Sequence, residues 1–300
     1  MKGSTMKHAY LIVAHNQIEL LKTLLSLIDD EDNDIYLHID TKWADFEETD
    51  IKNEVNKSNL FMVDRRSVVW GGFSLVQVEL DLLKATLNKK YDYYHLLSGV
   101  DLPLKSQKYI HKFFEEHKGQ EFISFDYKQN SEQFVDRVDQ YRLFQEKYGN
   151  KKTILYYFDK VSIKIQKVFG IHRQSHFSSK LKKGSQWFSI TNDLAMYILE
   201  QEKNIQKRFR MSRACDELFL QTLVFDSPFR DNLYYDNDAG RYYNMRFIDF
   251  QRGNPYVFRE SDFDMLLNRQ ELFARKFDWN TDNKIIEKIS KCILGDENNG

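Results

Sequence analysis

Short apolar runs alternate with stretches of helical periodicity along the first half of the chain. Strands are predicted at 8–14, 34–40, 60–63, 93–97 and 122–125, and helices at 18–28, 75–87 and 110–117. Strands joined by crossover helices are typical of an open α/β sheet. The pattern therefore predicts a Rossmann-like, mostly parallel central sheet flanked by helices.

The composition favours one large domain. The chain has 300 residues, 42% of them hydrophobic, with only three prolines and twelve glycines to supply flexible linkers. We expect a single domain over residues 6–293, divided into halves 6–125 and 126–293 and ending in a C-terminal extension. Residues 1–5 precede a second methionine, Met6, and are expected to be a cloning remnant.

The charge balance argues against a nucleic-acid partner. Lys and Arg total 44 against 45 Asp and Glu, a net charge of -1, whereas phosphate binding normally needs a basic excess. Two cysteines, Cys215 and Cys292, cannot form a disulfide framework, which favours a reducing, cytoplasmic location. The apolar runs are too short to span a bilayer, so membrane contact would be peripheral.

Residues 151–183 form a basic segment. They contain nine Lys or Arg against the single acid Asp159, interleaved with apolar residues. Two interpretations stand side by side. In one, an amphipathic helix lies on an anionic membrane surface, at the inner face of the cell membrane, with its lysines on lipid phosphates. In the other, it is an ordinary surface helix whose apolar side packs on the protein.

Polar residues end several predicted strands, and ligands of open α/β sheets collect at that edge. Any one of them could be a turn former, but five at one edge favour a site. Glycine-rich phosphate loops, G-x-S-x-G, H-E-x-x-H and C-x-x-C are all absent, which points by elimination to sugar-nucleotide transferases. The strand-end residues are His15, Asp40, Asp64, Ser98 and Asp101.

Four motifs follow one another along the chain. They are LSGVDLPLKS at 97–106, GSQWFSIT at 184–191, DELFLQTL at 216–223 and LFARKFD at 272–278. With these motifs in this order, the chain from about His8 to about Ile293 resembles the core-2/I-branching β-1,6-N-acetylglucosaminyltransferases and the related peptide O-xylosyltransferases. The resemblance implies a GT-A type fold with a nucleotide-binding half at 6–125 and an acceptor and catalytic half at 126–293. It also implies inverting transfer of GlcNAc, or of xylose, from a UDP-sugar to a glycan hydroxyl without a divalent metal.

The resemblance assigns the central roles to two charged residues. Glu217 matches the family's general base and is expected to start a helix over 217–225, although a glutamate there also suits a helix N-terminus with Asp216 as its cap. Lys276 matches a lysine that replaces the metal at the diphosphate. The partnering arginine is Arg252 as the best-placed residue, with Arg259 and Arg246 as alternatives.

Further residues follow from the same resemblance. It places His15 and Asp40 beside the uridine, where a carboxylate can accept the uracil imide proton or a ribose hydroxyl. Two of the candidates, Trp70 and Trp187, would also suit a hydrophobic core. We expect Trp70, Gly71, Ser98 and Asp101 to contact the UDP-sugar, and Trp187, Ser189 and Arg142 to contact the acceptor.

Two other functions remain open on this sequence. A metal-dependent GT-A transferase of another family would use Asp101, or Asp236 and Asp238, although a turn explains the latter pair better. A carbohydrate-binding protein without chemistry would not need Glu217 and Lys276. The few cysteines and the missing anchor favour a bacterial enzyme of surface-polysaccharide synthesis, acting on a glycan or lipid-linked glycan.

Overall fold

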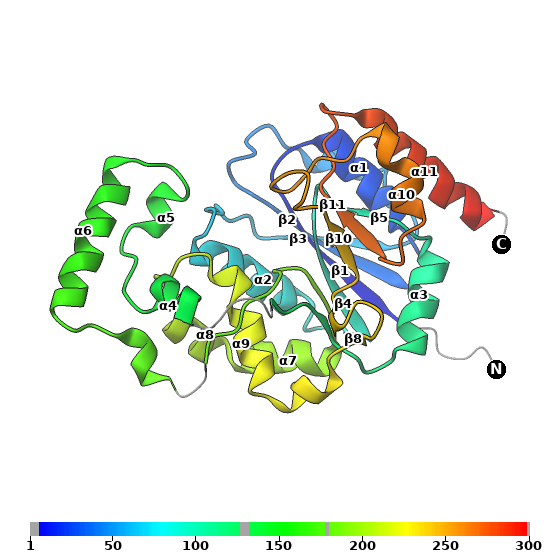
Figure 1. The fold of residues 1–300 in the computed structure, drawn as a ribbon. Coiled ribbons are helices and arrows are strands. Elements are labelled where there is room, and N and C mark those ends of the chain that lie inside the picture. The colour runs from blue at the N-terminus through cyan, green and yellow to red at the C-terminus, as the bar shows by residue number, and fades with distance from the viewer. Residues whose placement is uncertain (1–5, 127–131, 178–179, 299–300) are drawn as a thin grey trace.

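The computed structural model describes residues 6–126, 132–177 and 180–298, and its centre is a six-stranded sheet in the order β3-β2-β1-β4-β7-β6 (Figure 1). Strands β1 to β4 are parallel, and β7 runs antiparallel to both of its neighbours. The predicted mostly parallel α/β sheet is confirmed. The strands are β1 (His8–Ala14), β2 (Asn33–Ile39), β3 (Asn59–Val63), β4 (Tyr93–Ser98), β6 (Phe122–Ile123) and β7 (Phe188–Thr191).

Helices cover both faces of this sheet, which explains why β1, β2 and β4 are buried almost throughout. Each face carries its own apolar core. The C-terminal extension is α11, which packs against α1. One face carries α1 (Ile18–Leu27), α3 (Gln107–Glu116), α10 (Phe263–Leu267) and α11 (Asn283–Asn298), and the other carries α2 (Phe73–Ala85), α7 (Asn192–Glu200), α8 (Glu202–Phe209) and α9 (Phe219–Phe225).

A second, three-stranded sheet joins β10 (Arg246–Ile248), β11 (Phe273–Arg275) and β5 (Leu102–Pro103). Its link to the main sheet is the buried Arg246. Its guanidinium group donates to the carbonyl oxygens of Asn244 at 2.5 Å, Leu96 at 3.4 Å and Phe188. It also donates to Ser189 Oγ at 3.0 Å. Burial lowers the pKa of Arg246 to about 9. These bonds place the end of β11 beside β4 and β7.

A helical segment projects from the sheet on the side away from α11 (Figure 1). It contains α4 (Glu132–Val138), α5 (Gln145–Tyr148) and α6 (Ile154–Val168). None of the helices in the described ranges combines the length and apolarity needed to cross a bilayer. A small hairpin, β8 (Tyr235–Asp236) and β9 (Arg241–Tyr242), follows α9.

Three predicted helix starts differ from the structure. Helix α2 begins at Phe73 rather than at residue 75, and α3 begins at Gln107 rather than at residue 110. The third difference affects the site. The helix expected over 217–225 begins at Phe219, and residues Cys215–Glu217 form a separate 3-10 turn. Ala214, with a φ of 47°, lies in the left-handed region just before this turn and redirects the chain. Glu217 therefore lies before the helix rather than in its first turn.

Replacing Arg246 with Met should destabilise the fold, because the carbonyl groups that it satisfies would stay buried without a donor. We expect the free energy of unfolding in urea to fall by about 3–5 kcal/mol. The matched control is Arg241→Met on the exposed β9, which should cost less than about 1 kcal/mol. Equal losses for the two variants would contradict a joining role for Arg246.

Candidate functional site at the carboxyl edge of the sheet

The loops that leave β1, β2 and β4 begin side by side at the carboxyl edge of the main sheet. The Asp40 amide donates to the Ala14 carbonyl at 2.9 Å, and the Gly99 amide donates to that of Val13 at 3.0 Å. A Cβ atom on Gly99 would lie 2.8 Å from Ala14 Cβ, so this approach requires glycine. His15, Asp40 and Ser98 are thereby brought together, as the sequence predicts.

Asp40 is buried and fixed by backbone donors. One carboxylate oxygen accepts from the Lys42 amide at 2.9 Å and the other from the Val68 amide at 3.3 Å, with Lys42 Nζ 3.8 Å away. A carboxylate held in this way has lone pairs left for a further donor. Asp40 can therefore accept a hydrogen bond from a ligand without rearranging.

His15 lies in a mixed electrostatic environment. Restricted hydration lowers its pKa, Asp40 opposes that effect, and the positive charges of Arg275, Lys276 and Lys42 lower it further. Arg275 also contacts Ser98 and Asp101, which places the end of β11 at the end of β4, the neighbour of β1. A neutral imidazole beside several cations suits a site that receives an anion.

Ser98, Asp101 and Arg275 form one ion-paired cluster. Asp101 accepts from the Ser98 amide at 2.8 Å and from the Ser98 hydroxyl at 2.7 Å. Arg275 Nη1 lies 2.9 Å from the same carboxylate and also contacts Ser98 Oγ. Because both carboxylate oxygens accept hydrogen bonds, the function of Asp101 visible here is to position Arg275.

Arg275 and Lys276 place two cations at this edge. The Arg275 guanidinium lies 4.6 Å from the ring centroid of Trp187, within cation–π range. Lys276 is half-buried, and its amino group forms no ion pair with any residue that the structure describes. Sequence reasoning assigned no role to Arg275, although the motif at 272–278 contains it next to Lys276.

The arginines expected to partner Lys276 have other contacts. Arg252 pairs with Asp249 at 2.5 Å and with Asp262 at 2.6 Å. Arg246 is buried between the two sheets, and Arg259 is exposed. Unlike these three arginines, Arg275 contacts Ser98 and Asp101 at the carboxyl edge.

Glu217 is partly exposed and flanked by cations. Its Oε2 atom accepts from Arg137 Nη1 of α4 at 2.8 Å and lies 3.8 Å from Lys183 Nζ. Its side chain keeps 38% of its surface exposed, so the carboxylate remains accessible to a reactant. The projecting segment thus supplies one partner of the candidate base, which sequence spacing could not indicate.

The GSQW motif connects Glu217 to the cations. The Gly184 amide donates to the Glu217 carbonyl at 3.0 Å, and the Trp187 amide donates to Ser185 Oγ at 3.3 Å. A Cβ atom on Gly184 would lie 1.8 Å from the Ser124 carbonyl oxygen, so the chain can pass there only as glycine. Trp187 itself is buried directly before β7, under Arg275.

The loop at residues 69–72 lies against the segment that leads to Glu217. The Ala214 amide donates to the carbonyl of Gly71, whose φ is 68°. Trp70 has 55% of its surface exposed, which contradicts a core position, and lies 5.8 Å from the Arg213 guanidinium. The exposed indole is available for stacking on a ligand.

Two predicted acceptor residues make structural contacts instead. Ser189 is fully buried and hydrogen-bonded to His95 at 2.7 Å and Arg246 at 3.0 Å. Arg142 donates to the Asp136 carbonyl at 2.8 Å and lies 3.8 Å from the buried Asp159. Neither side chain is placed to meet an acceptor directly.

Acidic groups elsewhere have local explanations. Asp236 accepts from the amides of Asp238 and Ala239, both at 3.0 Å, so the turn interpretation of this stretch is confirmed. Asp30, Asp32 and His111 could share an ion by distance, since their ligand atoms lie within 4.8 Å of one another. Asp32 already pairs with Lys7 at 2.7 Å and His111 is hydrogen-bonded to Asn33 at 2.8 Å.

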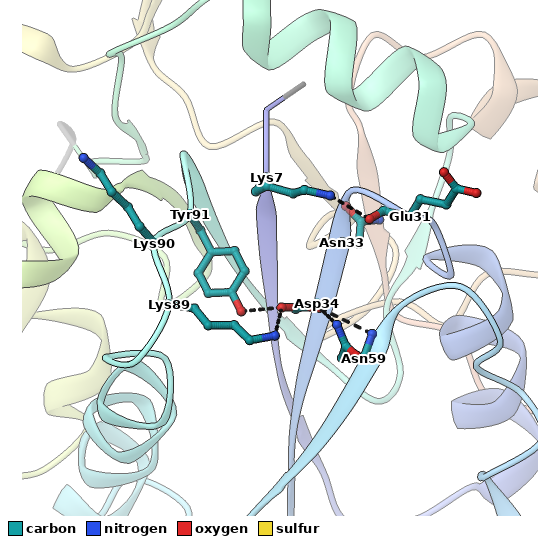
Figure 2. Close-up of a pocket in the computed structure, with 8 residues that line it drawn as sticks. All are labelled: Lys7, Glu31, Asn33, Asp34, Asn59, Lys89, Lys90 and Tyr91. Carbon is teal, nitrogen blue, oxygen red and sulfur yellow. Dashed lines mark hydrogen bonds and ion pairs between the residues drawn. The ribbon is translucent and has the colours of Figure 1, made fainter. Parts of the chain in front are cut away.

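A pocket of about 380 Å³ lies at the opposite, amino edge of the sheet (Figure 2). Asp34 at its centre accepts from Lys89 at 2.7 Å, Tyr91 at 2.6 Å and Asn59 at 2.7 Å. Burial opposes ionisation of Asp34, but these hydrogen bonds outweigh it and lower the pKa. The carboxylate at the centre of this pocket is already held by three internal partners, so we place the functional site at the carboxyl edge.

Fold and site together define an α/β protein in which two cations, Arg275 and Lys276, lie at one edge of the sheet. The accessible carboxylate of Glu217 lies apart from them. The family model described as Core-2/I-branching enzyme matches residues 8–264. The chain therefore belongs to the core-2/I-branching enzyme family.

Individual relatives agree with this assignment. Rat (Rattus norvegicus) xylosyltransferase 2 is 23% identical over 98% of this chain, and the human (Homo sapiens) β-1,3-galactosyl-O-glycosyl-glycoprotein β-1,6-N-acetylglucosaminyltransferase is 24% identical over 91% of it. The matches cover 34% and 66% of those proteins. The apo structure of mouse xyloside xylosyltransferase 1 is a weaker match, with a TM-score of 0.38 and 10% identity, and covers 89% of this chain and 96% of that one.

Asp216 is a buried acid next to the candidate base. Burial, with a further contribution from Glu217, raises its pKa from 3.8 to about 7. Its Oδ1 atom has no hydrogen-bond partner within the described residues. A second buried acid, Glu79, also has a raised pKa, through burial and the charge of Asp216. Asp216 therefore keeps its proton in the folded protein up to about neutral pH.

Asp216→Asn should change how stability depends on pH. Between about pH 4 and 7 the folded state holds a proton that the unfolded chain releases, so this group makes the free energy of unfolding fall as pH rises. The Asn variant carries no such proton, so its free energy of unfolding does not decrease with pH through this group. The difference between the variant's free energy of unfolding and that of wild type should therefore increase from pH 5 to pH 8. Urea titrations at both pH values measure it, with the exposed Asp231→Asn as control. A pH-independent difference would refute the assignment.

Proposed function

We propose that this protein is an inverting glycosyltransferase that moves GlcNAc, or xylose, from a UDP-sugar to a hydroxyl group of a glycan acceptor. The observation that carries the proposal is the pairing of Arg275 and Lys276 at the strand ends with an accessible Glu217 across the GSQW motif. Its relatives' names, xylosyltransferase and N-acetylglucosaminyltransferase, support the choice of sugars.

The donor would lie along the carboxyl edge. Asp40 accepts a hydrogen bond from the uracil imide or the ribose, and His15 lies beside it. Trp70 and Gly71 supply an exposed indole and a close-lying backbone next to the Glu217 segment. Ser98 and Asp101 act through Arg275, which they position.

The leaving group is stabilised by fixed cations in this mechanism. Arg275 and Lys276 neutralise the charge that develops on the diphosphate, the task that a divalent metal performs in other transferases. Arg275 is held by Asp101 and Trp187 before a ligand arrives, so little reorganisation is needed. The proposal therefore requires no cofactor.

Glu217 acts as the general base. The acceptor hydroxyl oxygen forms a bond to the anomeric carbon as the bond from that carbon to the diphosphate oxygen breaks. The hydroxyl proton passes to the Glu217 carboxylate, and UDP leaves with the electron pair. Arg137 of the projecting segment and Lys183, directly before the GSQW motif, keep the carboxylate in position. Attack opposite the leaving group inverts the anomeric centre.

The biological setting belongs to the same proposal. A glycan or lipid-linked glycan acceptor in surface-polysaccharide synthesis, in a bacterial cytoplasm at the inner face of the membrane, fits the two cysteines and the near-neutral charge. Detection of acceptor-dependent UDP release with such glycans would test it. The donor sugar can be identified by comparing the thermal shifts that UDP-GlcNAc and UDP-xylose produce, with UDP as the reference.

Glu217→Gln should abolish transfer while leaving nucleotide binding intact. Removal of a general base costs roughly 10²–10⁴-fold in rate. The thermal shift produced by UDP should match that of wild type, because the substitution leaves Arg275, Lys276 and Asp40 unchanged. Glu115→Gln on the exposed face of α3 is the control. Wild-type turnover by Glu217→Gln would remove this residue from the mechanism.

Lys276→Met should weaken catalysis. Chelation of metal ions should leave the catalysis of the wild-type protein unchanged. Loss of one preorganised cation at the leaving group should lower the turnover number by roughly 10²–10³-fold. Wild-type turnover should be the same in excess EDTA as in added Mn²⁺. Lys284→Met in the exposed first turn of α11 is the control. Activity that EDTA removes and Mn²⁺ restores would favour the metal-dependent alternative.

A further inference from the structure

Helix α6 turns an apolar stripe toward solvent. Its large hydrophobic residues recur at spacings of three and four, which places them on one side of a helix with about 3.6 residues per turn. Such a stripe is normally buried against the protein, but here its side chains are exposed. Helix α6 lies at the outer end of the projecting segment, away from the main sheet (Figure 1). The exposed fractions are 71% for Ile154, 57% for Tyr157, 56% for Phe158, 53% for Val161, 52% for Ile165 and 84% for Val168, followed by 77% for Phe169.

Polar residues of α6 face the protein instead. Asp159 is fully buried and accepts from Tyr148 Oη at 3.0 Å and from the Phe144 amide at 3.3 Å. Gln166 is buried and exchanges two hydrogen bonds with the Tyr141 backbone, at 2.7 Å and 2.9 Å. The helix is therefore fixed with its polar side inward. This arrangement contradicts the interpretation of an ordinary surface helix packed by its apolar side.

Lysines border the apolar stripe. Lys160 and Lys164 are exposed and lie on one flank of the helix, between the stripe and the side that faces the protein. Lys167 lies on the same flank and pairs with Asp136 at 3.0 Å. The only acid of the helix, Asp159, is buried, so the exposed surface of α6 combines apolar and cationic groups alone.

We propose that α6 docks this protein onto an anionic lipid bilayer. An interfacial helix inserts its apolar side at the boundary between headgroups and acyl chains, while flanking lysines meet lipid phosphates. The stripe and the lysine flank of α6 match these two layers. A second copy of the chain is a poorer partner, because the only acid of α6 is buried and the facing helix would bring lysines to lysines. The nearby exposed acid, Asp136 of α4, already pairs with Lys167.

Docking through α6 also specifies the acceptor, a step that rests on the proposed function. The segment that carries α6 also carries Arg137, which contacts the candidate base Glu217 at 2.8 Å. A bilayer bound by this segment would therefore lie on the acceptor side of the molecule. A glycan carried on a membrane lipid is the acceptor class that fits this geometry.

Vesicle binding tests the surface directly. We expect the full-length protein to co-sediment at low salt with vesicles of phosphatidylcholine containing one third phosphatidylglycerol, and several-fold less with pure phosphatidylcholine or at high salt. The variant Phe158→Ser/Val161→Ser/Ile165→Ser should reduce binding at least tenfold. Because these side chains are exposed, the variant should keep the wild-type melting temperature.

Matched controls separate the outcomes. Leu87→Ser changes an equally exposed leucine at the end of α2 and should bind vesicles like wild type. Lys160→Ala/Lys164→Ala should weaken binding to anionic vesicles, whereas Lys108→Ala/Lys112→Ala on α3 should not. Absence of binding by wild type, or undiminished binding by the serine variant, would overturn the proposal. A concentration-dependent dimer that the serine variant abolishes would assign the surface to a second copy instead.

Nucleotide binding distinguishes this inference from the proposed function. The serine variant should retain the wild-type thermal shift with UDP and wild-type transfer to a water-soluble glycan, while losing transfer to a glycolipid in vesicles. If the serine variant loses vesicle binding but binds UDP normally, α6 serves in membrane docking and not in nucleotide binding. Vesicle binding without any shift by UDP would retain the docking surface and reject the donor assignment.

Discussion

The buried guanidinium of Arg246 is the constraint on which the site depends. It joins the small sheet to β4 and β7 through carbonyl groups and a serine hydroxyl. Because β10 pairs with β11, this junction helps to fix where Arg275 and Lys276 lie, together with the pairing of β11 with β5. The Nε atom of Arg246 has no hydrogen-bond partner within the described residues, but its two Nη atoms satisfy buried carbonyl groups that another arrangement would leave without a donor. The cations of the carboxyl edge are therefore positioned in part by a contact between the two sheets.

Much of the fold could be predicted because its central strands are buried on both faces. Continuous apolar runs such as 8–14 give a signal that local sequence carries alone. The start of α9 could not be predicted in the same way. An acid-rich stretch before an apolar run suits both a helix N-terminus and a 3-10 turn, and the left-handed Ala214 decided between them. The orientation of α6 depended on the hydrogen bonds of Asp159 and Gln166 to other segments.

The site divides along the same line. His15, Asp40, Ser98 and Asp101 follow strands, so topology alone brings them together. Arg275 contacts Asp101, more than a hundred positions away in the sequence, and Arg137 contacts Glu217, about eighty positions away. No local sequence pattern indicates such distant pairs. Ser189 fails as an acceptor residue because strand alternation turns it into the sheet interior. Arg252 is held by Asp249 and Asp262, which spacing to Lys276 could not reveal.

The 3-10 turn that presents Glu217 has a consequence for how this architecture can diverge. Its carboxylate is steadied by a residue of the projecting segment, whereas its backbone is anchored by the GSQW motif of the sheet. The projecting segment also contacts the loop at residues 69–74, where Gln145 donates to the Trp70 carbonyl at 3.3 Å and Glu146 accepts from the Ser74 amide at 2.9 Å. Under the proposed function, evolution can therefore change acceptor preference most easily in α6, outside these contacts, as long as each redesign still brings one cation to Glu217.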